Sequence, residues 1–105
     1  PDWHIEDKRR QVSFETAASK ASADGSEDLT RLQERMKAAR SNFKSQSRAL
    51  DKLLAERRAV RKERQAARRQ ELEEAIAKLR DDIATIRAEF AQIMSDLTAF
   101  KPMAA

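Results

Sequence analysis

The chain has 105 residues, of which 38% are charged and only 5% are aromatic, and it contains one Gly, two Pro and no Cys. Such usage is typical of a coiled coil or a long helix and argues against a globule with a large core. The absence of cysteine excludes a disulfide scaffold and a Cys-ligated metal site. No apolar run approaches the roughly 20 residues of a membrane span and no signal peptide is recognisable, so we expect an intracellular, cytoplasmic protein without a membrane span.

The formal net charge of +4 is unevenly distributed along the chain. Residues 1–28 carry 4 Lys and Arg against 7 Asp and Glu, residues 29–71 carry 14 against 5, and residues 72–105 carry 4 against 6. A partner attracted by charge is therefore expected to meet the middle of the chain.

Residues 1–26 are polar and contain the only glycine. The pairs Trp3/Ile5 and Val12/Phe14 alternate like short extended pieces, although a helix over 6–22 also fits. We predict an N-terminal arm that is flexible or becomes ordered on a partner. Trp3, the sole tryptophan, is the candidate anchor of this arm in a partner's pocket, since Trp is enriched at interface hot spots; a disordered terminus is the other interpretation.

The stretch from Leu29 to Phe100 contains neither Gly nor Pro. Ser26 is a good N-cap, and Pro102 cannot continue a helix. The prediction is therefore an all-α fold, a single long continuous helix over about 27–100 that forms a coiled coil, with a frayed C-terminus at 101–105. Such a rod would be on the order of 110 Å long.

Two apolar stripes follow the heptad spacing of a coiled coil. The predicted oligomer seam lies in the C-terminal half and comprises Leu72, Ile76, Leu79, Ile83, Ile86, Phe90, Ile93, Leu97 and Phe100. The second seam comprises Leu29, Leu32, Met36, Phe43, Leu50, Leu53 and Leu54. A long helix with such stripes needs a partner to bury them, so we expect a homo-oligomer or pairing with helices of a larger protein assembly.

The segment 57–69 interrupts the stripes with a basic patch on the same face of the helix. Its cations are Arg57, Arg58, Arg61, Lys62, Arg64, Arg68 and Arg69. Two such segments cannot close as a dry seam, because like charges would meet there. An acidic protein partner is the first interpretation, solvated arginines without a partner are the second, and phosphate contact with nucleic acid is the third.

The basic segment followed by an apolar array superficially resembles a basic-region leucine zipper over about 40 residues. The sequence Ala-Ala-Arg-Arg at 66–69 carries the resemblance. That family has Asn at the position of Glu63 and Arg at the position of Glu71, and its zipper repeats Leu at every seventh residue. A carboxylate at a base-contacting position would be repelled by DNA, so we do not place the chain in this family.

Nothing in the sequence supports catalysis. His4 is interpreted as a solvated side chain, and the carboxylate pairs at 73–74 and 81–82 as solvated surface. Motifs for phosphate, zinc or calcium binding are missing. We therefore predict a protein that is not an enzyme and has no cofactor, no metal and no small-molecule substrate.

The sequence thus favours a coiled-coil structural or adaptor protein that oligomerises and docks within a larger assembly, using its basic patch for an acidic partner. The alternative is a nucleic-acid-binding or packaging protein that uses 57–69. An intramolecular hairpin is disfavoured, because no Gly, Pro or Asn lies between residues 43 and 100 to break the helix.

Overall fold

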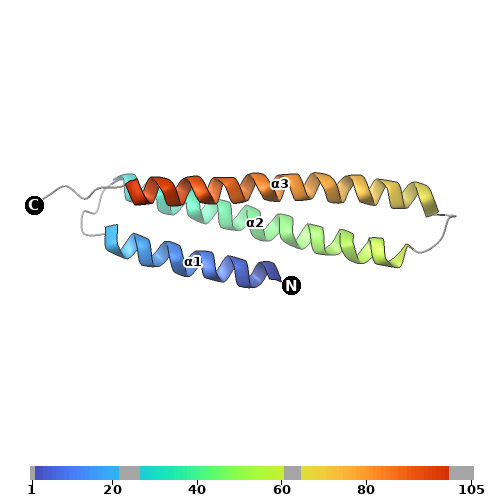
Figure 1. The fold of residues 1–105 in the computed structure, drawn as a ribbon, viewed down its shortest axis with the longest axis horizontal. Helices are drawn as coiled ribbons and strands as arrows, with labels where there is room; N and C mark the ends of the chain where they lie inside the picture. Colours follow the sequence, from blue (N-terminus) through green and yellow to red (C-terminus); the bar gives the residue numbers. More distant parts are fainter. Residues whose placement is uncertain (1, 22–26, 61–64, 100–105) are drawn as a thin grey trace, which may run out of the picture.

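The computed structural model describes residues 2–21, 27–60 and 65–99, which form three helices. These are α1 (Asp2–Ala21), α2 (Glu27–Ala59) and α3 (Ala66–Ala99). Helices α2 and α3 lie side by side as an antiparallel hairpin, and α1 lies along one half of it (Figure 1). The molecule is elongated, with extents of 70 × 19 × 15 Å.

The prediction of one continuous helix over 27–100 is wrong, because the chain turns back between Ala59 and Ala66. In the final turn of α2, the Val60 amide donates to the carbonyl oxygens of Glu56 (3.1 Å) and Arg57 (3.3 Å). A straight rod would leave both apolar stripes in water, whereas the hairpin buries each stripe against the other. This gain outweighs the helical hydrogen bonds that are lost at the break.

The two predicted seams form the core of a single chain. On α2 and α3, Phe43 and Ile93 are 0% exposed, and Leu72 and Ile76 are 1% exposed. The other buried seam residues are Leu29, Leu32, Met36, Ile83, Phe90 and Leu97, whereas Leu50, Leu53, Leu54, Leu79 and Ile86 are half-buried. Phe100 lies outside the described residues. Because the seams pair within the chain, unpaired stripes no longer argue for self-association.

The predicted N-terminal arm is a helix over Asp2–Ala21 that packs on the hairpin. Its buried residues are Asp7, Phe14, Ala18 and Ala21, and three of these join the apolar core cluster. The alternation of Trp3/Ile5 and Val12/Phe14 suggested short extended pieces, but this segment is helical. Small alanine side chains let this otherwise polar helix approach α2 and α3 closely.

Helix α1 covers only part of the hairpin. Its first turn contacts α2 at Asp51, through a hydrogen bond from Trp3. Beyond that level, the remainder of α2 and the start of α3 project as a two-helix extension (Figure 1). The protein thus has a three-helix end and a two-helix end.

A distance measurement tests the hairpin directly. Glu34 and Ser95 are exposed residues next to Arg35 and Asp96, which form an ion pair between α2 and α3 at 2.7 Å. Spin labels on a Glu34→Cys/Ser95→Cys variant should lie about 20 Å apart, since packed helices have axes about 10 Å apart. In a continuous helix the same sites would be about 90 Å apart. The chain has no other cysteine.

Dilution with unlabelled protein is the control for this measurement, which uses pulsed dipolar electron paramagnetic resonance. A short distance that survives dilution supports the intramolecular hairpin. A distance near 90 Å, or a short distance that disappears on dilution, would contradict it.

Candidate functional site

The basic segment lies at the closed end of the hairpin, which we call the hairpin tip and define as residues 56–60 and 65–73. Figure 1 shows that this end projects beyond α1. Arg58 and Arg69 are exposed here, and neither has an ion-pair partner within the described ranges. The remaining predicted cations between the two ranges, Arg61, Lys62 and Arg64, lie outside the described residues.

The other two described cations of the tip are paired. Arg57 of α2 lies 3.4 Å from a carboxylate oxygen of Glu73 on α3. Arg68 of α3 contacts Glu56 at 2.7 Å and Glu71 at 3.2 Å. These partners are partly exposed, so solvent screening leaves each pair with little net effect on stability. Among the described residues of the tip, Arg58 and Arg69 are therefore the cations that no ion pair occupies.

Trp3, predicted as an anchor for a partner, is anchored on its own chain. Its indole Nε1–H donates a 2.7 Å hydrogen bond to Asp51 of α2. The ring packs edge-on against Phe43, with centroids 6.2 Å apart, and stacks on His4 at 3.7 Å. Trp3 therefore fixes the start of α1 on the hairpin.

A partly buried arginine lies where the three helices meet. The side chain of Arg10 is 15% exposed, and its Cζ lies 3.8 Å from the centroid of Phe90 and 4.8 Å from that of Phe43. Glu6 accepts a 2.6 Å hydrogen bond from Arg10 and two from Arg87 of α3, at 2.9 and 3.0 Å. The hydrogen bonds from Arg87 and Arg10 lower the pKa of Glu6, against the opposing effect of burial.

A second ion pair ties α1 to α2. Asp7 is only 4% exposed and accepts two hydrogen bonds from Arg40, at 3.0 and 2.8 Å. Lys44 lies 3.8 Å from the same carboxylate. The bidentate contact with Arg40 lowers the pKa of Asp7, and burial opposes this shift. An unpaired carboxylate at this depth would be costly, so Asp7 requires these cations.

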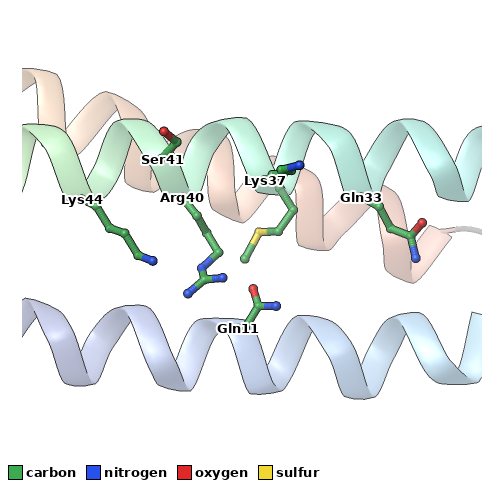
Figure 2. Close-up of a pocket in the computed structure, with 7 residues that line it drawn as sticks. Gln11, Gln33, Lys37, Arg40, Ser41 and Lys44 are labelled. Atoms are coloured by element: carbon green, nitrogen blue, oxygen red, sulfur yellow. The ribbon is translucent and has the colours of Figure 1, made fainter.

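A groove of about 430 Å³ lies between α1 and α2 at this point. Figure 2 shows Gln11 of α1 and Arg40 of α2 pointing toward each other across it. Its lining residues are Gln11, Gln33, Met36, Lys37, Arg40, Ser41 and Lys44. The groove is rich in hydrogen-bond donors, but the Asp7 carboxylate pairs with two of its cations, Arg40 and Lys44.

A third charged group joins α2 to α3 near the open end of the hairpin. Arg35 contacts Glu89 at 3.0 Å and Asp96 at 2.7 Å. The hydrogen bond from Arg35, followed by one from Gln92, lowers the pKa of Asp96. This group is well exposed and acts mainly in orienting the helices.

These depressed pKa values predict acid lability. In the unfolded chain Glu6 has an ordinary pKa of 4.5, and Asp7 and Asp96 have 3.8. Because their pKa values are lower in the folded state, they stabilise it fully above those values, and the contribution is lost as the pH falls through the folded pKa values. Urea midpoints measured by circular dichroism should hold above about pH 5 and fall below it.

A Glu6→Gln variant is the matched test of this pH dependence. It should unfold more easily at neutral pH and show a smaller fall in its urea midpoint between pH 5 and pH 3. An unchanged pH slope in this variant would remove Glu6 from the set of responsible groups.

Within residues 2–21, 27–60 and 65–99, no group of three or more His, Asp and Glu side chains is placed to hold a metal ion. None of the described helices has the length and apolar character that crossing a membrane requires.

The comparisons with known proteins give no relative. The chain matches no family model, no curated protein and no solved structure.

Sequence reasoning missed the face of α1 that packs on the hairpin. Asp7, Phe14, Ala18 and Ala21 are spaced by seven, four and three residues, which places them on one face of a helix. This spacing was the available signal. It is weak because its members are an acid, one aromatic and two alanines.

Proposed function

We propose that the protein is a non-enzymatic helical adaptor that docks within a larger assembly through its hairpin tip, which contacts an acidic protein surface. The observation that carries the proposal is the pair Arg58 and Arg69. Both are exposed, both lie on the projecting end, and neither has an ion-pair partner among the described residues. Self-association through the two seams is not part of the proposal, because most seam residues are buried within one chain.

The charge pattern of the tip favours a protein partner over nucleic acid. Glu56, Glu71 and Glu73 lie among the arginines and would repel a continuous phosphate backbone. The segment 57–69 also contains no aromatic residue on which a base could stack. An acidic protein surface can instead place separate carboxylates opposite individual arginines.

The test is affinity capture of the tagged full chain from the cells that make it, followed by identification of the proteins bound. An Arg58→Glu/Arg69→Glu variant should lose an acidic partner that the unmodified chain retains. The matched control is Lys8→Glu/Lys20→Glu, which changes the net charge equally at two exposed positions on α1. The control should retain that partner.

Loss of the partner in both variants would mean that overall charge matters and the tip does not, and retention in both would reject the tip as the docking site. Nucleic acid is tested separately by gel shift with duplex DNA and single-stranded RNA at low and high salt. Salt-dependent binding that only the tip variant loses would replace the acidic protein with nucleic acid as the partner.

A further inference from the structure

A small cavity lies where the start of α1 meets the hairpin. Its volume is about 320 Å³, close to the lower end of the range for small-molecule sites. All three helices contribute to its walls, so it exists only while α1 is docked. The lining residues are Trp3, Ser47, Leu50, Asp51, Arg80, Ile83 and Arg87.

Ser47 supplies a hydroxyl to the lining of this cavity. The residue is only 3% exposed and lines the cavity, yet its hydroxyl has no hydrogen-bond partner among the described residues. Among the described residues, the fully buried side-chain atom without a partner is Arg10 Nη1 and not the Ser47 hydroxyl, which therefore keeps accessible surface at the cavity. The hydroxyl is therefore available to a molecule that occupies the cavity.

Two arginines supply charge at the same place. Arg80 is exposed and has no ion-pair partner in the part of the chain that the structure describes. Arg87 uses Nε and Nη2 to bind Glu6, which leaves Nη1 able to donate elsewhere. The one acid in the lining, Asp51, already accepts the indole hydrogen bond of Trp3.

The rest of the lining is apolar and rigid. Trp3 is fixed by its hydrogen bond and by its contact with Phe43, and Ile83 is 4% exposed. Together with the half-buried Leu50, these side chains offer a surface for a short hydrocarbon or aromatic group. The cavity thus combines an apolar wall, the accessible Ser47 hydroxyl and cationic donors.

We propose that this cavity binds a small apolar monocarboxylate, whose carboxylate pairs with Arg80 and Arg87 and accepts a hydrogen bond from Ser47 while its apolar part packs on Trp3, Leu50 and Ile83. The site is separate from the hairpin tip and does not depend on the function proposed for it. A ligand bound here touches all three helices and therefore stabilises the docking of α1.

The sole tryptophan gives a specific readout, because the protein has one indole N–H resonance in a ¹H–¹⁵N spectrum. Titration of the full chain with 3-phenylpropionate should shift that resonance with a Kd on the order of 1 mM or below. The uncharged 3-phenylpropionamide should bind at least about 10-fold more weakly, since it loses the charge-assisted hydrogen bonds.

Two variants and one control locate the contacts. Arg80→Gln should weaken carboxylate binding roughly 10-fold, and Ser47→Ala should weaken it about 3-fold or more. Lys78→Gln removes an exposed cation of the same helix outside the cavity and should leave the Kd unchanged. Circular dichroism checks that each variant retains its helices.

Each other outcome overturns the proposal. Equal binding of acid and amide, or preferential binding of 3-phenylpropylamine, would reject the carboxylate assignment. Full affinity in Arg80→Gln, a uniform shift across the spectrum, or no shift of the indole resonance would reject the cavity as the site.

Discussion

Replacement of Phe43 by alanine should destabilise the protein by about 3–5 kcal/mol, the range seen when a fully buried aromatic side chain is truncated. Phe43 is 0% exposed, and its ring contacts Phe90 with centroids 5.7 Å apart, Trp3 at 6.2 Å and the guanidinium of Arg10 at 4.8 Å. One substitution therefore weakens the contacts of α2 with both α1 and α3. Since small domains have total stabilities of about 5–15 kcal/mol, a large share would be lost.

Urea unfolding followed by circular dichroism measures this effect. Val12→Ala is the control, because Val12 is 61% exposed and its truncation should change stability by less than about 0.5 kcal/mol. Similar losses in the two variants would show that Phe43 is not buried as described.

Asp7→Asn should cost about 2 kcal/mol and should act mainly on α1. The substitution leaves Arg40 and Lys44 without the carboxylate that both contact. Removal of one member of a fully buried ion pair costs about 3–5 kcal/mol, but these two side chains are 23% and 41% exposed and can regain water. The expected loss is therefore smaller than for Phe43→Ala.

Trp3 allows the loss to be assigned to α1. Its fluorescence reports the docking of α1, whereas circular dichroism reports all three helices. In Asp7→Asn the fluorescence transition should occur at lower urea than the helix transition. Asp81→Asn, at an exposed position of α3, should leave both transitions in place; coincident transitions in Asp7→Asn would contradict a separate weakening of α1.

The sequence predicted which side chains form the core much better than what they pack against. Heptad spacing identified Leu32, Met36 and Phe43 on one stripe and Phe90 and Ile93 on the other, and all five are buried. A stripe shows only that a helix face needs cover. It does not distinguish a second chain from a later part of the same chain, and here the cover is intramolecular.

The helix break was missed because the prediction relied on Gly and Pro as the signals for ending a helix. The residues around Ala59 and Ala66 favour helix locally, and the break results from a tertiary gain that no local propensity expresses. The charge count gave a hint, since a basic segment between two apolar stripes is suited to a solvent-exposed turn.

Helix α1 was harder to predict for a different reason. Its contacts with the hairpin include ion pairs through Glu6 and Asp7, and most of its buried apolar side chains are small alanines. Ion pairs between distant residues leave no periodic trace in one sequence. The alternation around Trp3 and Ile5 then suggested an extended segment, although the spacing of the buried residues on α1 was helical.

Because α1 covers only part of the hairpin, the two ends of the molecule should differ in local stability. Opening of the two-helix end exposes Leu72 and Ile76 but need not disturb Phe43, Phe90 or Ile93, which α1 helps to cover. Local opening should therefore be less costly at the hairpin tip than at the three-helix end. The two helices of the hairpin should therefore separate first at the tip, while the three-helix end remains folded.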